Sequence, residues 1–208
     1  MTGGMVIGIL NAIGSQLILK LIPLIGFHNR VIKIQVTALS LVILLYTNIA
    51  LITLADKTHL SYRWFQNYGT AIYTGLIMSN MFFYLKPLIQ ICMVKKCKKT
   101  DVDRGDFVLE RRYALMINTV FVIFTFGFYM PTLFIVGAAN FLCIYFLDKL
   151  LITYWCENAP IHSDSLHFFS LNVLKYAPVL LLVFAGASID FNYCMVNGDK
   201  VVPNYILN

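Results

Sequence analysis

Apolar residues along this chain come in long blocks that are separated by short polar stretches. A helix rises about 1.5 Å per residue, so about 20 apolar residues cross a hydrocarbon core of roughly 30 Å. The blocks therefore predict membrane-spanning helices. We expect six of them: Gly3–Gly26, Val36–Ala55, Trp64–Val94, Tyr113–Phe128, Pro131–Tyr154 and Leu166–Ile189.

The fourth and fifth of these helices come from one uncharged run of 35 residues, Tyr113–Leu147. This run is too long for one comfortable span. Gly127 and Pro131 lie near its middle, and proline breaks a helix because it lacks an amide hydrogen and clashes with the preceding turn. We expect a tight turn there, with Gly127 and Pro131 acting as a hinge. A single long, kinked and tilted helix is the alternative.

The composition supports a membrane environment. Hydrophobic residues make up 59% of the chain and charged residues only 12%, whereas an ordinary soluble domain carries about 25% charged residues to cover its surface. The sequence therefore predicts an all-α integral membrane protein with about six transmembrane helices in a bundle.

The basic residues predict the orientation of the bundle. The chain carries 16 Lys and Arg against 10 Asp and Glu, and most of the basic residues follow the first, third and fifth predicted helices. Cytoplasmic loops of membrane proteins are enriched in basic residues, so these loops are expected inside the cell. Both termini would then lie outside, which we interpret as an indication that the chain belongs to a longer protein.

This orientation divides the chain into four parts: helices in 1–94, a basic cytoplasmic linker in 95–112, helices in 113–191 and an extracytoplasmic tail in 192–208. The lysine cluster Lys95–Lys99 directly follows an apolar stretch. Such a position suits contact with anionic lipid headgroups better than with nucleic acid.

Small residues recur at helical spacing in two of the predicted helices. Close approach of helix backbones at such stripes drives packing in lipid. We expect helix packing, and the alternative is a seam along which helices slide to open a pathway. The stripes consist of Gly4, Gly8 and Ala12, and of Ala71, Gly75 and Ser79.

Polar side chains at membrane depth must find partners, so they should point into the bundle or into a wet cavity. Each could make a hydrogen bond between helices, or several together could line a narrow path. Lys86 could extend to the cytoplasmic surface or point into such a path and repel cations. The candidate lining residues are Asn48, Asn80, Lys86, Asn118 and Asn140.

Features of enzymes are missing from the sequence. The four histidines have no paired metal-ligand spacing, and there is no nucleophile, phosphate-loop or dinucleotide motif. The apolar parts of the first four predicted helices and of the sixth contain no carboxylate, so a proton relay lacks its usual groups. We expect neither an enzyme nor a cofactor or metal site.

Several residue pairs give the later helices a resemblance to a known family. Tyr113-Ala114, Phe126-Gly127, Pro131 and Asp148-Lys149 follow one another at the spacing found in part of the seven-helix region of OSCA-type channels. These channels are stretch- and hyperosmolality-gated cation channels related to anoctamins and TMC proteins. Upstream, Thr47-Asn48, Trp64 and Gly69 are also similar to family members.

The resemblance also has departures. The family's second proline is Ile135 here, and its Tyr-Ser pair is Phe126-Gly127. Acidic pairs like those that bind calcium in anoctamins are not evident. The resemblance covers most of this chain, but the early helices, the cytosolic domain and one pore helix of the family have no counterpart in it.

Three functions are consistent with these patterns. The resemblance implies a tension-gated cation channel, or a fragment of one, acting as a membrane conduit. The short length and the small-residue stripes favour instead a non-conducting structural subunit that packs against other membrane subunits. A small transporter is a third class, although no inverted repeat or buried ion-coupling carboxylate supports it.

Overall fold

The computed structural model describes residues 2–54, 62–97, 108–154 and 164–194, and the side chains of residues 7–50, 68–85, 88–89, 108–153 and 164–186. The described chain is all helical, as the sequence predicts. Its elements in order are α1 (Thr2–Leu21), the 3-10 helix η1 (Ile22–Ile25), α2 (Arg30–Leu54), α3 (Tyr62–Cys97), α4 (Leu109–Phe126), α5 (Thr132–Tyr154), α6 (Ser165–Leu174) and α7 (Ala177–Cys194).

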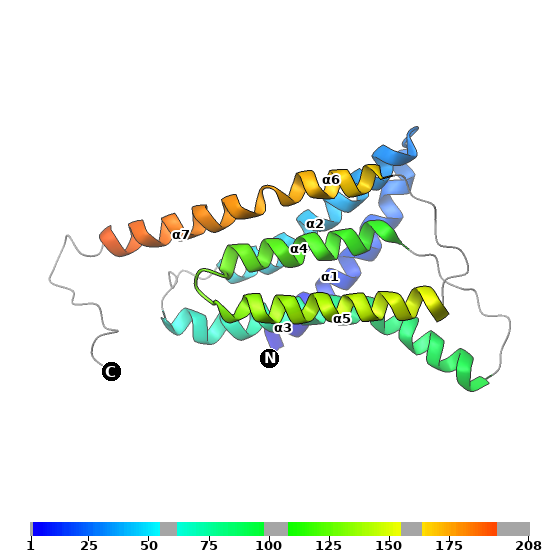
Figure 1. The fold of residues 1–208 in the computed structure, drawn as a ribbon, viewed down its shortest axis with the longest axis horizontal. Coiled ribbons are helices and arrows are strands. Elements are labelled where there is room, and N and C mark those ends of the chain that lie inside the picture. The colour runs from blue at the N-terminus through cyan, green and yellow to red at the C-terminus, as the bar shows by residue number, and fades with distance from the viewer. Residues whose placement is uncertain (1, 55–61, 98–107, 155–163, 195–208) are drawn as a thin grey trace.

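The helices form an elongated bundle in which successive long elements run in opposite directions (Figure 1). α4 and α5 lie side by side, α3 packs along α5, and α6 and α7 follow one another along the opposite edge. The junction of α1 and α2, the end of α3, the start of α4, the end of α5 and the start of α6 all lie at one end of the bundle. Three pairs of consecutive helix ends therefore lie at the same end of the bundle.

Four helical stretches are long and apolar enough to cross a membrane: Ile7–Ile25, Arg30–Ala50, Thr132–Thr153 and Ser165–Gly186. The six-span prediction is thus supported only in part. α4 has just 18 residues, and its first turn contains Glu110, Arg111 and Arg112. α3 is less apolar because hydroxyl and amide side chains interrupt its hydrophobic residues.

The first helix was predicted to continue to Gly26, but its α-helical part ends five residues earlier. The α-helix stops at Leu21 and tightens into the short 3-10 helix η1, which contains Pro23 near its start. Proline cannot donate the hydrogen bond that would continue the α-helix. Gly26 then ends the segment with φ +69°, a left-handed conformation that glycine adopts at little cost.

The second helix begins six residues before its predicted start at Val36. Asn29 stands just before the helix, and its side-chain Oδ1 accepts a hydrogen bond from the Val31 amide at 2.9 Å. Asparagine at this position satisfies one of the amide hydrogens that a helix start leaves unbonded. Arg30 and Lys33, expected in a loop, consequently belong to the helix.

The predicted split between the fourth and fifth helices is confirmed, and a single long helix is excluded. α4 ends at Phe126, and hydrogen bonds from the Gly127 amide to Ile123 (2.7 Å) and from the Met130 amide to Phe126 (3.0 Å) close the turn. The ring of Phe134 lies where a side chain at residue 127 would be. Gly127 is therefore required here by close packing, because any larger residue would displace that ring.

The sixth predicted helix consists of two segments that follow the same line (Figure 1). The break lies at Lys175 and Tyr176, just before Pro178. Pro178 has no amide hydrogen for the carbonyl of Leu174, so the helix cannot pass this point without interruption. The Lys175 amide still bonds to Leu171 at 3.1 Å, which keeps the two segments nearly in register.

Three clusters of buried apolar side chains hold the described bundle together. The Phe126 cluster contains residues of all five helices from α1 to α5. The Leu45 cluster joins α2 and α4, and the Tyr84 cluster joins α3 and α5. Outside these clusters the surface is apolar, with Leu24 80%, Ile135 73% and Leu182 69% exposed. A surface of this kind suits contact with lipid chains and is unfavourable in water.

The small residues of α1 and α3 lie at the contact between these two helices. A side chain at Gly8 would meet Met78 and Phe82 of α3 at 3.0 Å, and Gly75 lies against Ile7 of α1. Ser79 is buried in the same contact, whereas Ala12 and Ala71 are half-buried. Gly4 lies in α1, outside the residues whose side chains are described.

Replacing Gly8 by valine should destabilise the bundle by about 1–3 kcal/mol, because the new methyl groups would force α1 and α3 apart. The matched control is Gly186→Val in α7, where nothing lies within 4 Å of the added group. Unfolding free energies measured in lipid bicelles would show a loss for the first variant and little change for the second. Equal losses would contradict the α1–α3 packing described above.

Candidate functional site

A chain of hydrogen bonds crosses the middle of the bundle from α2 through α1 to α3. Asn48 donates from Nδ2 to Asn11 Oδ1 at 2.7 Å, and Asn11 donates from Nδ2 to Ser79 Oγ at 2.7 Å. Ser79 in turn donates to the Gly75 carbonyl at 2.7 Å. Three helices are thereby joined by amide and hydroxyl groups in a region otherwise filled with apolar side chains.

Three further asparagines are buried beside this chain. Asn80, Asn118 and Asn140 are 5%, 1% and 9% exposed. Asn80 Oδ1, Asn118 Oδ1 and Asn140 Nδ2 have no hydrogen-bond partner among the described residues. Each buried polar atom without a partner costs about 1–3 kcal/mol. These three atoms therefore need partners other than the described side chains.

These asparagines share one level of the bundle. Each asparagine lies between two apolar residues of its own helix. One of these residues belongs to the Phe126 cluster, and the other belongs to the Tyr84 cluster or packs against it. Asn80 lies between Leu76 and Tyr84, Asn118 between Val122 and Met116, and Asn140 between Leu133 and Ile144. Since Asn80 adjoins Ser79, the hydrogen-bonded chain lies at this level too.

We refer to Asn11, Asn48, Ser79, Asn80, Asn118 and Asn140 as the polar layer. It contains four of the five residues that the sequence offers as lining candidates. They are arranged across the bundle, on α2, α3, α4 and α5, rather than one after another along its axis. The fifth candidate, Lys86, lies in α3, but its side chain is outside the described residues.

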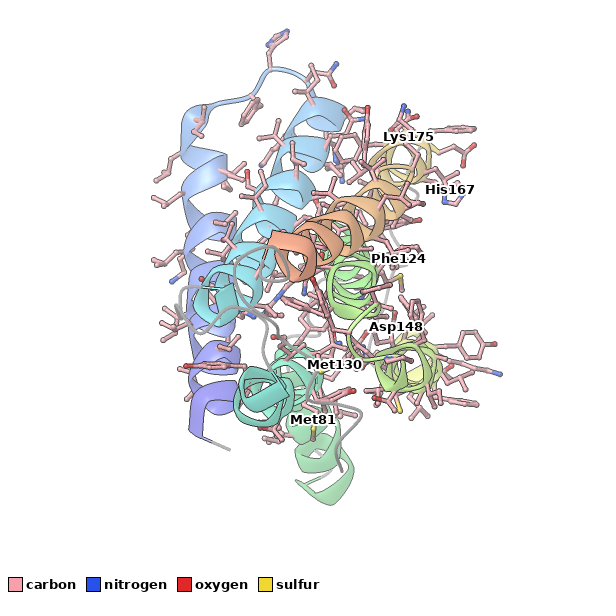
Figure 2. All side chains as sticks on the ribbon, turned by 90° about the vertical axis from the view of Figure 1, so that its left-hand side faces the viewer. Met81, Phe124, Met130, Asp148, His167 and Lys175 are labelled. Atoms are coloured by element: carbon pink, nitrogen blue, oxygen red, sulfur yellow. The ribbon has the colours of Figure 1, made fainter. Side chains whose placement is uncertain are left out.

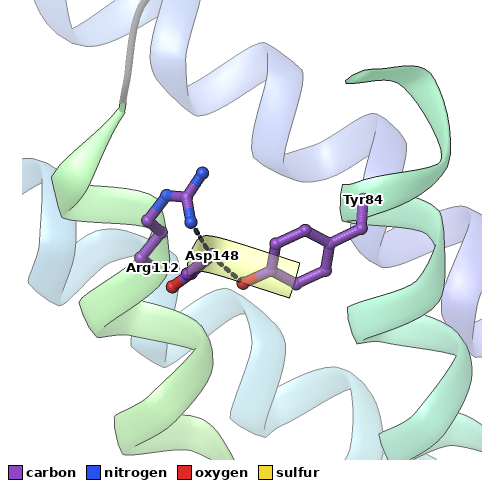
Figure 3. A network of polar contacts seen from close by, with 3 residues as sticks. All are labelled: Tyr84, Arg112 and Asp148. Atoms are coloured by element: carbon purple, nitrogen blue, oxygen red, sulfur yellow. Dashed lines mark hydrogen bonds and ion pairs between the residues drawn. The ribbon is translucent and has the colours of Figure 1, made fainter. Parts of the chain in front are cut away.

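A second polar group joins α3, α4 and α5 (Figure 3). It lies near the end of the bundle that holds the start of α4 and the end of α5. Asp148 of α5 forms an ion pair with Arg112 of α4 and accepts a hydrogen bond from the Tyr84 hydroxyl of α3 at 2.6 Å. Arg112 is 7% exposed and Asp148 16%. The contact therefore lies in a shielded position, where opposite charges attract more strongly than in water.

Aromatic rings surround the cationic side of this group. The guanidinium carbon of Arg112 lies 5.5 Å from the ring centre of Phe83 and 5.6 Å from that of Tyr84. The guanidinium of Arg111 lies 4.5 Å from the centre of Phe83. Cations over aromatic faces are stabilised by the negative face of the ring. These contacts help to hold two arginines at the start of an otherwise apolar helix.

Arg112 falls in the predicted cytoplasmic linker (95–112) and Asp148 in the predicted fifth helix, so the sequence alone does not bring them together. The signal available was that Asp148 is the one carboxylate in the range 113–155. A carboxylate so close to the apolar run needs a cationic partner. Asp148 lies on α5 on the side that faces the neighbouring helices (Figure 2).

Other types of site are not evident in the described part of the chain. It contains no group of three or more His, Cys, Asp or Glu side chains that could hold a metal ion. Comparison with models of protein families, with curated proteins and with solved structures gives no match for this chain. The polar layer and the Arg112–Asp148–Tyr84 group are consequently the features on which a functional interpretation depends.

Replacing Asp148 by asparagine should lower the unfolding free energy by about 3–5 kcal/mol, because it removes the carboxylate that forms an ion pair with the buried Arg112. The double variant Arg112→Met with Asp148→Leu should recover most of this loss. Tyr84→Phe removes one hydrogen bond to a charged acceptor and should cost less, about 1.5–3 kcal/mol. Unfolding in bicelles measures all three. Strictly additive losses from Arg112→Met and Asp148→Leu would rule out the coupling.

Proposed function

We propose that this chain is a multi-pass membrane protein whose six spans are α1 with η1, α2, α3, α4, α5, and α6 with α7. In this proposal α4 crosses with its charged first turn at the interface, and α3 crosses as a polar-faced helix within the bundle. The gathering of Arg30, Lys33, Arg111 and Lys149 at one end of the bundle supports this. By the positive-inside rule, that end is cytoplasmic.

Single cysteines test this topology in a background whose five native cysteines are alanine. His28→Cys and Lys149→Cys should react with a membrane-impermeant reagent only from the cytoplasmic side. Phe128→Cys, in the α4–α5 turn, should react only from the other side. Labelling of residues 128 and 149 from the same side would exclude α5 as a span.

We further propose that the bundle is a gated conduit, closed in this structure. The observation that carries the proposal is the set of three buried amides with unpartnered atoms on α3, α4 and α5. In a conduit these atoms would bond to a permeating species or its water. In a bundle that serves only packing, apolar residues at these three positions would avoid the cost of burying amides.

The apolar clusters on both sides of the polar layer would form the gates. Buried apolar side chains make up most of both clusters, and the Tyr84 hydroxyl is bonded to Asp148. Narrow apolar constrictions close to ions by excluding water, and they conduct when widened. Expansion of the bundle under membrane tension would widen them. The resemblance of Tyr113–Lys149 to OSCA-type channels supports tension as the stimulus and cations as the permeating species.

Reconstituted protein recorded under membrane stretch tests the conduit. Asn140→Leu should reduce the stretch-activated conductance about tenfold, because it joins the two apolar clusters and raises the barrier by roughly 1.4 kcal/mol. The control is Asn172→Leu, at an exposed position of α6, which should leave the conductance unchanged. Absence of any conductance in the unmodified protein and in its native complex would refute the proposal.

A second function, a structural subunit of a larger membrane complex, is favoured by a different observation. The Asn48–Asn11–Ser79 bonds fasten α1, α2 and α3 to one another, as a packing element requires. Native mass measurement in mild detergent separates the two functions. A stable complex with unrelated subunits supports the structural subunit, whereas a homodimer of longer chains supports the channel.

A further inference from the structure

Two unpartnered amide atoms belong to helices that pack against each other. α3 and α5 run in the same direction, since Tyr73 bonds to Thr132 at one end of the contact and Tyr84 bonds to Asp148 at the other. Tyr84 also shares a cluster with Ile144. Asn80 precedes Tyr84 by four residues, and Asn140 precedes Ile144 by four. The two asparagines therefore lie on the stripes of α3 and α5 that lead to the Tyr84–Asp148 contact, Asn80 one turn before it and Asn140 two turns before it.

Their free atoms are of opposite kinds. Asn80 donates from Nδ2 to the Leu76 carbonyl at 3.2 Å, which fixes the orientation of its amide and leaves Oδ1 as the acceptor. The amide of Asn140 makes no hydrogen bond to another described residue, and in the orientation it has in this structure its buried atom is the donor, Nδ2. Neither atom bonds to the other in this structure. The contact between α3 and α5 therefore contains one acceptor and one donor that require a third group.

The chemistry of the two atoms selects the occupant. A cation would bind Asn80 Oδ1 but would meet the amide hydrogens of Asn140, and an anion would meet the reverse conflict. No charged side chain lies within one turn of either asparagine along its helix. Water donates and accepts together, and buried waters in proteins commonly bond to two to four polar groups. A single neutral molecule of this kind satisfies both amides.

We propose that Asn80 and Asn140 form a binding site for water in the interior of the bundle. The water donates a hydrogen bond to Asn80 Oδ1 and accepts one from Asn140 Nδ2. The site exists in the closed protein and does not require that the bundle conducts. It goes beyond the conduit proposal because it assigns the occupant of the polar layer at rest.

Solid-state NMR of the full chain in lipid bilayers, with labelled asparagine, tests this site. Magnetisation transferred from water should reach the side-chain amide of Asn140. Two other asparagines serve as controls in the same spectrum. Asn11 is 2% exposed and donates directly to Ser79, so its amide should receive none, whereas exposed Asn29 should receive a strong signal.

The variant Asn80→Leu should abolish the transfer from water to Asn140, because it removes the acceptor. If this variant does not fold, the spectrum of the unmodified chain still decides. An Asn140 amide as dry as that of Asn11, or one bonded directly to the Asn80 carbonyl, would overturn the site. Water at the site without stretch-activated conductance would refute the conduit alone, and conductance with a dry Asn140 would refute the site alone.

Discussion

The structure depends on how amide groups are satisfied in the interior of a bundle that is otherwise apolar. An asparagine in the interior of an apolar bundle must bond to a neighbouring helix or to a buried polar molecule, because it cannot turn to water. Asn11, Asn48 and Ser79 meet this requirement through bonds between helices. Asn80 bonds only to the Leu76 carbonyl of its own helix, and Asn118 and Asn140 each bury an amide atom that has no partner among the described residues. Both the packing of the bundle and the functional proposals follow from this division.

The Asn48–Asn11–Ser79 bonds fix the relative height of α1, α2 and α3. A shift of one turn between these helices would break the bonds as well as the close packing at Gly8. The Arg112–Asp148–Tyr84 group adds a second fixed level toward the basic end, on α3, α4 and α5. The Tyr84 cluster surrounds this second level, with Ile144 on the side of the polar layer and Leu151 on the other side. A movement that opens the bundle must therefore separate apolar surfaces. If it also shifts these helices relative to one another, it must break the few polar contacts at the two levels.

The sequence allowed the all-helical class and most of the helix cores to be predicted, because long apolar blocks and prolines act locally. Pro131 and Gly127 mark the α4–α5 turn, and small residues mark the α1–α3 contact. Helix ends were predicted less well. Asn29 starts α2 before its apolar block begins, and Pro178 divides the last helix into two segments.

The arrangement of the polar residues could not be predicted in the same way. Hydropathy shows that Asn48, Asn80, Asn118 and Asn140 lie within helices. It does not show the height of each residue along the axis of the bundle. That height depends on the directions and offsets of the helices, which contacts such as Tyr84–Asp148 define. The pairing of Arg112 with Asp148 was missed for a similar reason, since α4 begins four residues before its predicted start.

The most direct test of this account measures the depth of these residues in a bilayer. Spin labels placed singly at positions 48, 80, 118 and 140 report their depth through collisions with oxygen and with a water-soluble nickel complex. The account predicts that all four lie at one depth, within about one helical turn of 5.4 Å. Depths that increase stepwise across the bilayer would contradict the polar layer and favour a lining along the axis of the bundle.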